Sequence, residues 1–376
     1  ASLLFTEKHI TSDLTLPTIG ASGTTISWKS SNPSVLSNEG KVTRPKKGAA
    51  DEEVTLKGTV KMGDYAKARN FTFVVLAESE MGPTKEFALD QVELLDDYYL
   101  TAQNSDIEFL KKFDNDRLLS RFRETAGLDT KKIAPYGGWE DGWLGGHSVG
   151  HYLTAIAQAV KATGNADLKE KSKQLIKGLA ECQNKLGTGF IFGAKIETEG
   201  YVEKQFDILE GKTTGKTWVP WYNMHKMLTG LVDTYKYTGN KQALEVAKKL
   251  GDWIYNRVSK WDAGTQGRVL GTEYGGMNDC LYELYLCTRD SKHLEAAHKF
   301  DEPNLYKTVA KGGKNCLNGK HANTTIPKFL GALKRYVVLE QTGELTKDDE
   351  AYLTNVEKFF DIAVTRHAYI TGGVSV

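Results

Sequence analysis

The chain has 376 residues, of which 40% are hydrophobic and 26% charged, enough for one large globular domain or two smaller ones. Its 49 basic and 48 acidic residues leave a formal net charge of +1, which argues against nucleic-acid binding and against a basic membrane-binding face. No stretch approaches the roughly 18 consecutive apolar residues of a transmembrane helix.

Residues 1–76 have the composition of a small β-domain. They are rich in Ser, Thr, Val and Gly and show no helical period. Residues 25–29 alternate between apolar and polar side chains, and residues 54–60 and 71–75 are rich in Val, Thr and Phe, as is typical of strands. We therefore expect a small all-β sandwich with a turn near Met62-Gly-Asp64.

A polar stretch over 77–86 is expected to be a linker, and helical periodicity dominates 87–376. Four similar turns recur there between amphipathic segments. They are Thr163-Gly164-Asn165, Thr238-Gly239-Asn240, Thr288-Arg289-Asp290 and Thr342-Gly343-Glu344. Gly ends a helix in the left-handed conformation, and Asn or Asp caps the next helix. Repeated helical hairpins of this size predict a mainly α fold, an α/α toroid with inner first helices and outer second helices.

Polar groups precede each of these turns, at the expected starts of the inner helices. Because inner helices of a toroid begin at one rim, these side chains should gather around one mouth. We expect the following residues to form a binding site there: His147, Trp221, Tyr222, His225, Glu273, Tyr274, Asn278, His321 and Asn323.

Alternatives remain open for several of these residues. His147 and His151 have the spacing of two metal ligands on a helix, but without a third ligand nearby hydrogen bonding is favoured. His225 could equally be a core histidine. Tryptophans border these histidines, and their rings could stack on sugars or simply pack between hairpins. The Gly-Gly pairs lack the context of a phosphate-binding loop.

Six blocks of the second region resemble the β-L-arabinofuranosidase glycoside hydrolases of families 127 and 146. They are Pro135-Tyr-Gly-Gly-Trp-Glu140, Gly146-His-Ser-Val-Gly-His-Tyr-Leu153, Tyr222-Asn-Met-His-Lys226, Glu273-Tyr-Gly-Gly-Met-Asn-Asp279, His321-Ala-Asn-Thr-Thr-Ile-Pro-Lys328 and Tyr369-Ile-Thr-Gly-Gly373. The resemblance implies an α/α six-hairpin barrel that hydrolyses terminal β-linked L-arabinofuranose with retention. It also implies a zinc-bound cysteine thiolate as nucleophile and a glutamate as general acid/base.

The sequence departs from that family pattern at its C-terminal end. In the family, the acid/base glutamate lies just past the Thr-Gly-Gly turn and the zinc ligands follow, whereas this sequence ends three residues after Gly373. None of Cys182, Cys280, Cys287 and Cys316 occupies a family ligand position, and we expect all four to be buried thiols. The resemblance thus implies an incomplete barrel that lacks the family's catalytic residues and zinc ligands and is inactive by itself.

Within the site, the family's substrate contacts carry over best onto His225 and His321 and less surely onto His147. Tyr274 stands where relatives usually have a histidine, which implies a possible change in substrate preference. Separately, residues 25–45 resemble bacterial immunoglobulin-like modules of secreted carbohydrate-active enzymes. That likeness implies a spacer domain and a secreted or cell-surface protein.

Two other functions remain alternatives to this one. An inverting glycosidase would use two carboxylates about 6.5–9.5 Å apart, and Glu140, Asp141, Glu273 and Asp279 are the candidates. A carbohydrate-binding or adhesion protein would use the same rim without turnover. In each case we expect a glycan to be the partner, not a nucleic acid or a membrane.

Overall fold

The computed structural model of the chain describes residues 9–20, 23–46, 49–78, 86–194, 201–313 and 316–374. It divides into two compact units, Ala1–Glu86 and Phe87–Val376. Most of the expected linker, residues 79–85, lies outside the described residues.

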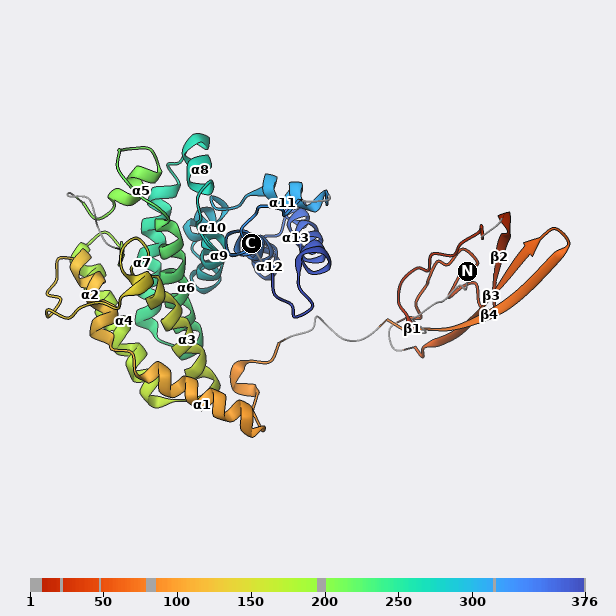
Figure 1. Cartoon of the computed structure of the whole chain (residues 1–376), viewed down its shortest axis with the longest axis horizontal. Helices are drawn as coiled ribbons and strands as arrows, with labels where there is room; N and C mark the ends of the chain where they lie inside the picture. Colours follow the sequence, from red (N-terminus) through yellow and green to blue (C-terminus); the bar gives the residue numbers. More distant parts are fainter. Residues whose placement is uncertain are drawn as a thin grey trace. The chain divides into compact units, whose positions relative to one another are not determined.

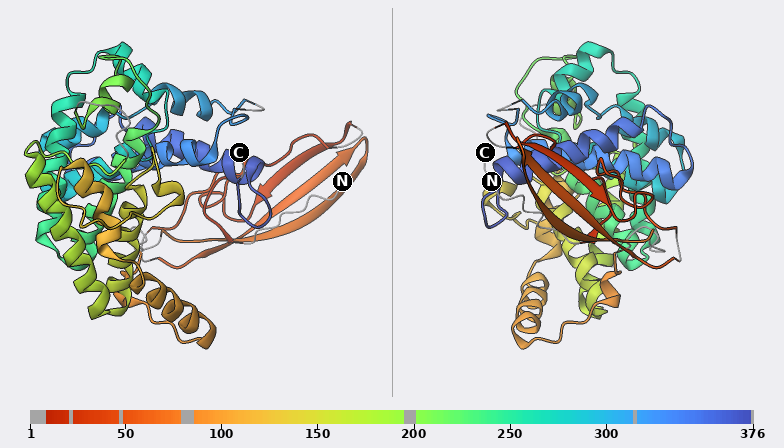
Figure 2. Two further views of the ribbon diagram at one scale, coloured as in Figure 1. Left: turned by 60° about the vertical axis from the view of Figure 1, so that its left-hand side comes forward. Right: turned by 90° about the vertical axis from the view of Figure 1, so that its right-hand side faces the viewer.

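The N-terminal unit contains a four-stranded sheet in the order β1-β4-β3-β2 (Figure 1). Its strands are β1 (His9–Ile10), β2 (Thr25–Ser30), β3 (Glu52–Met62) and β4 (Tyr65–Val75). β1 pairs with β4 in parallel, and the other pairs are antiparallel. The three predicted strands and the turn near Gly63 are confirmed, and β3 and β4 form one long hairpin (Figure 2).

One face of this sheet carries the core of the unit. Ile26 and Trp28 alternate with exposed neighbours along β2, as the period of a half-buried strand requires. A Cβ at Gly58 would lie 2.8 Å from the Trp28 ring, so the indole packs where the facing strand has no side chain. The segment 31–46 contributes the buried Leu36 to the same core.

The second unit is helical, as predicted. Its α-helices are α1 (Asp97–Lys111), α2 (Asn115–Thr125), α3 (His147–Thr163), α4 (Ala166–Leu186), α5 (Lys204–Leu209), α6 (Pro220–Thr238), α7 (Lys241–Val258), α8 (Ala263–Leu270), α9 (Met277–Thr288), α10 (Ser291–His298), α11 (Pro303–Ala310), α12 (Ala322–Thr342) and α13 (Glu350–Ile362). Short turns of other helix types cover Leu89–Gln91, Gly138–Glu140 and Ala363–His367. No helix in the described ranges is both long and apolar enough to cross a membrane.

The four recurring turns join the hairpins α3–α4, α6–α7, α9–α10 and α12–α13, which confirms the repeat. The residue that ends each first helix is left-handed, with φ of 69° at Gly164, 71° at Gly239, 55° at Arg289 and 74° at Gly343. In the first three turns, Asn or Asp then accepts a hydrogen bond from a backbone N–H of the next helix. In the fourth, α13 begins only after a longer segment.

Inner and outer helices form two layers. α3 packs on α6, α6 on α9 and α9 on α12, while α4 packs on α7 and α7 on α10, and the hairpins follow one another in chain order (Figure 1). Glycines permit the closest crossing, because a Cβ at Gly150 of α3 would lie 2.1 Å from the backbone oxygen of Lys226 in α6. The predicted α/α arrangement of inner and outer helices is therefore confirmed.

The expectation of four buried thiols is only half right. Cys182 and Cys280 are buried, whereas Cys287 and Cys316 are partly exposed, and all four are free. Cys287 lies in the last turn of α9 and Cys316 in the segment between α11 and α12, where fewer layers of protein cover a side chain.

Candidate functional site

A cavity of about 410 Å³ lies where the inner helices begin. Its walls come from the segment before α3 and from the starts of α6, α9 and α12. The structure brings five of the nine predicted residues to this cavity, namely His147, Tyr222, Glu273, His321 and Asn323. The gathering of inner-helix starts is therefore confirmed, while contact of these residues with a sugar stays a prediction.

Two tryptophans outside the predicted set also line the cavity. Trp139 is 72% exposed and Trp218 is 49% exposed. Each lies ahead of an inner helix, Trp139 in the short turn Gly138–Glu140 before α3 and Trp218 shortly before Pro220 of α6. That position was the signal available in the sequence, because a ring ahead of a helix start does not follow the core-facing stripe of the helix.

Trp221, which was predicted to be at the site, is instead fully buried. It lies in the first turn of α6 and packs edge-to-face on Phe206, Trp261 and Phe300. Its ring is thus part of the aromatic core beneath the cavity rather than of the cavity wall.

Glu140 and His147 form a buried pair at the start of α3. The Glu140 carboxylate accepts hydrogen bonds from the backbone N–H of Gly146 at 2.6 Å and of Ser148 at 2.9 Å. Nδ1 of His147 lies 2.8 Å from Glu140 Oε1 and 2.6 Å from the Leu144 carbonyl oxygen. Both neighbours only accept hydrogen bonds, so Nδ1 carries the hydrogen and Nε2 is left for other partners.

Each member of this pair stabilises the charged form of the other. Burial by itself would raise the pKa of Glu140, but hydrogen bonds from His147, Gly146 and Ser148 outweigh it and hold the pKa below its usual value. Burial also opposes a charge on His147, yet Glu140 and the Leu144 carbonyl raise the pKa of the imidazole above its usual value. Glu140 is therefore an ionised cap of α3 that orients His147.

A second polar group connects α6, the segment before α9 and the start of α12. Nδ2 of Asn323 donates to Glu273 Oε1 at 3.0 Å, and Asn323 also interacts with the Tyr222 hydroxyl. Nζ of Lys226 lies 4.7 Å from the centre of the Tyr222 ring, within the range of a cation–π contact. Burial lowers the pKa of Lys226.

The remaining three predicted residues lie in the core behind the cavity. Nδ1 of His225 accepts from the Gly276 N–H at 3.0 Å, and burial lowers the pKa of the ring well below its usual value, so His225 is neutral. The Tyr274 hydroxyl donates to Glu302 at 2.8 Å, and Nδ2 of Asn278 donates to Asp301 at 3.1 Å. These side chains tie neighbouring hairpins together beneath the site.

Of the four carboxylates considered for an inverting mechanism, only Glu273 lines the cavity. Asp141 is exposed and pairs with Arg121 at 2.7 Å. Asp279 is covered by neighbouring helices, and burial raises its pKa to about 6. Glu140 is committed to capping α3 and orienting His147. The cavity thus contains one available carboxylate from this set rather than a pair.

A larger hollow of about 780 Å³ lies beside α10, α12 and α13. Arg335 in its wall is already paired, with 2.8 Å to Asp301 and 2.7 Å to Asp349. The lining of this hollow includes none of the residues predicted for the site.

The region that builds the cavity matches a known family. Residues 91–376 match the family described as β-L-arabinofuranosidase, GH127 catalytic domain. The chain belongs to this GH127 family. Residues 5–78 match the atrophied bacterial Ig domain, in agreement with the immunoglobulin-like resemblance of the N-terminal unit. No curated protein matches this GH127 chain by sequence.

A solved structure shares the fold of this region. A GH127 β-arabinofuranosidase structure superposes with a TM-score of 0.50 and 17% identity, covering 76% of this chain and 44% of its own. A GH127 β-L-arabinofuranosidase from Geobacillus stearothermophilus has a TM-score of 0.46, 17% identity and the same coverage. The chain therefore spans less than half the length of these relatives.

Proposed function

We propose that this GH127 protein is a retaining glycoside hydrolase that removes terminal β-linked L-arabinofuranose from plant glycans, and that the 410 Å³ cavity binds this sugar. The observation that carries the proposal is the cavity itself. It lies inside the family-matched region 91–376 and combines two exposed indoles with two carboxylate-centred hydrogen-bonded pairs.

These groups suit a furanose ring. The faces of Trp139 and Trp218 offer apolar surface for the C–H groups of the sugar. Nε2 of His147 is available to a hydroxyl because Nδ1 is engaged by Glu140 and Leu144. Glu273 keeps Oε2 as an acceptor because Asn323 binds Oε1. A few oriented polar groups beside aromatic walls are typical of small-molecule sites.

We infer that none of the four cysteines is the catalytic nucleophile. A reactive thiolate needs a lowered pKa, whereas burial raises the pKa of Cys182 to about 11 and that of Cys280 well above its usual value. Burial also raises the pKa of Cys287. None of the four lines the cavity.

Zinc, which the family likeness implies for the whole enzyme, does not fit the cysteines of this chain. Within the described residues, no group of three His, Cys, Asp or Glu side chains close enough to share a metal includes a cysteine. We propose that nucleophile, acid/base glutamate and zinc ligands lie outside these 376 residues. The match to a bacterial Ig domain supports the further proposal that the protein is secreted or displayed on a cell surface.

Titration of the purified chain with methyl β-L-arabinofuranoside, followed by tryptophan fluorescence and calorimetry, tests the binding proposal. We expect saturable binding that Trp218→Ala and Asn323→Ala each weaken about tenfold, with an unchanged melting temperature. The α-anomer is the control ligand. Equal affinity for both anomers, or full affinity in both variants, would contradict the assignment of the cavity.

Hydrolysis of an aryl β-L-arabinofuranoside tests the catalytic part. We expect no turnover above the uncatalysed rate by this chain. Turnover that is lost in Glu273→Gln would instead favour an inverting glycosidase with an in-chain carboxylate. Sugar binding by a complete gene product that never shows turnover would favour a carbohydrate-binding or adhesion protein.

A further inference from the structure

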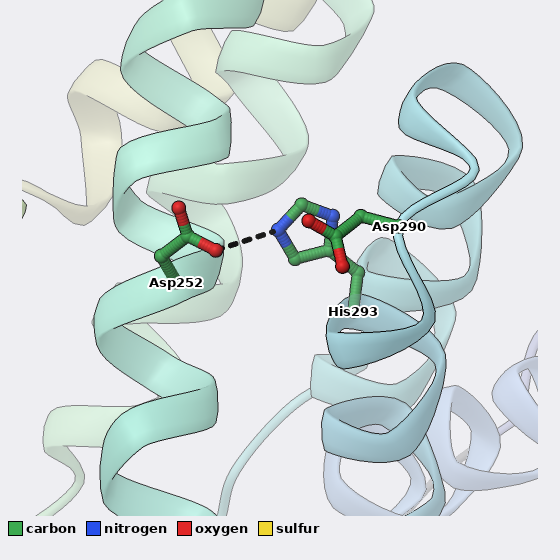
Figure 3. A group of neighbouring side chains, drawn as sticks. All are labelled: Asp252, Asp290 and His293. Atoms are coloured by element: carbon green, nitrogen blue, oxygen red, sulfur yellow. Dashed lines mark ion pairs between the residues drawn. The ribbon is translucent and has the colours of Figure 1, made fainter.

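Three potential metal ligands meet far from the cavity, at the opposite end of α9. They are Asp252 of α7, Asp290 in the α9–α10 turn and His293 of α10 (Figure 3). One ligand atom from each lies within 4.8 Å of the other two. The twelve residues of α9 separate this group from the cavity by about 18 Å at about 1.5 Å per residue.

The hydrogen bonds of His293 determine which ring nitrogen is available. The ring is 1% exposed, and its Nδ1 lies 2.8 Å from Thr288 Oγ1. The Thr288 hydroxyl has one hydrogen, which it donates to the Leu284 carbonyl at 3.0 Å. It therefore accepts from Nδ1–H, and Nε2 is left as an unprotonated acceptor in the neutral ring.

Nε2 of His293 faces another acceptor. It lies 3.8 Å from Asp252 Oδ1 (Figure 3), and both atoms are buried without a hydrogen-bond partner in the described part of the chain. A separation of 3.8 Å is too long for a hydrogen bond. Two ligands about 2.1 Å from a tetrahedral zinc ion lie about 3.4 Å apart, so a cation between these atoms needs only a small movement.

Asp290 completes the group with a free carboxylate oxygen. Its Oδ1 caps α10 by accepting from the Lys292 N–H at 3.0 Å, which leaves Oδ2 for a cation. Lys292 Nζ is 3.8 Å from Asp252 Oδ1, but this lysine is half exposed and can turn into solvent.

We propose that Asp252, Asp290 and His293 bind a divalent transition-metal ion, with Zn²⁺ as the expected occupant. One imidazole nitrogen and two carboxylates are a suitable set for such ions. The ion would join α7 to the start of α10 and so fasten two neighbouring hairpins in the outer layer. This site is separate from the cysteine-bound zinc expected for the whole enzyme.

Zinc titration of the tag-free, chelator-treated chain, by calorimetry and thermal denaturation, tests this proposal. We expect one ion per chain and a rise in melting temperature with zinc concentration. Asp252→Asn and Asp290→Asn should each weaken zinc binding at least about tenfold. Asp290→Asn retains the cap of α10, because Asn caps helices as well as Asp does. Asp262→Asn, at the cap of α8, is the matched control and should bind zinc like the unmodified chain.

Two further measurements test which side chains hold the ion. Lys292→Gln should raise zinc affinity, because it removes a competing cation next to Asp252. Bound Co²⁺ should show visible ligand-field bands without a thiolate charge-transfer band. Absence of binding, an affinity in both Asp variants equal to that of the unmodified chain, or a thiolate band would overturn the proposal. In that case the His293 ring would serve only the packing of α7 against α10, through its contacts with Thr288 and the backbone of Lys248.

Discussion

The two ends of the inner helices differ in how the sequence builds them. At the turn end, the same short pattern recurs, with a left-handed residue followed by Asn or Asp. At the cavity end, each helix begins differently. α3 is capped by Glu140 from the preceding segment, α6 begins with Pro220, and α12 follows the N-cap His321, whose side chain makes no capping hydrogen bond.

The turn ends of the inner helices thus carry the repeated sequence pattern, whereas the cavity ends carry the side chains that a ligand can contact. The repeated turn ends define the hairpins, and their Asn and Asp side chains cap the helices that follow. At the cavity end, side chains such as Glu273 and Asn323 are not used for capping and remain available to a ligand. Variants at the two ends should therefore affect different properties.

The largest expected difference in stability is between alanine variants of two tryptophans at the cavity end. Trp221→Ala should lower the free energy of unfolding by about 4 kcal/mol, because it empties a fully buried aromatic position. Trp218→Ala, three residues earlier, should change it by less than about 0.5 kcal/mol while weakening sugar binding. Urea denaturation measures both, and equal destabilisation would show that Trp218 is also a core residue.

Removing the charge of Glu140 should have an intermediate effect that depends on pH. The folded pKa of Glu140 lies below its usual 4.5, so its ionised form stabilises the fold above about that pH and loses this effect as the pH falls. The folded pKa of His147 lies above 6.5, so its contribution is complete below that pH and is lost as the pH rises through the folded pKa. Glu140→Gln should therefore lower the free energy of unfolding most, by about 2 kcal/mol, at pH values above the usual pKa of Glu140 and below the folded pKa of His147.

Denaturation curves across the pH range, with NMR titration of His147, check this prediction. The imidazole pKa should fall in Glu140→Gln. Asp141→Asn is the matched control, because that carboxylate is exposed and should be worth less than about 0.5 kcal/mol. If the loss of stability in Glu140→Gln did not depend on pH, Glu140 would stabilise the fold by something other than its charge.

The smallest effect is expected at the turn end. Arg289 is the non-glycine member of the left-handed turn residues, with φ of 55°. Arg289→Gly should raise the free energy of unfolding by about 0.5 kcal/mol, because glycine adopts this conformation without steric cost. Gly164→Ala, at φ of 69°, should lower it by about 1 kcal/mol. Melting temperatures that move the other way would show that side-chain contacts at Arg289 outweigh its backbone strain.

The sequence by itself determined the order of the elements and the hairpin repeat. Turn residues such as Gly164 and Asn165 act locally, through their own backbone conformation and caps, so their pattern can be read without knowledge of the fold. The strands of the first unit, the inner and outer layers of the second, and the gathering of polar helix starts followed from the same local signals.

Only the tertiary structure decided which of those side chains face the cavity. Trp221 and Trp218 are three residues apart and chemically identical, yet one is buried and the other half exposed. Trp221 lies in the first turn of α6 and packs on aromatic rings of other segments, whereas Trp218 precedes the helix. The proximity of Asp252 and His293 could not be predicted from the sequence either, because it depends on the packing of α7 against α10. Burial and contact between hairpins are properties of the packed layers, and no local pattern encodes them.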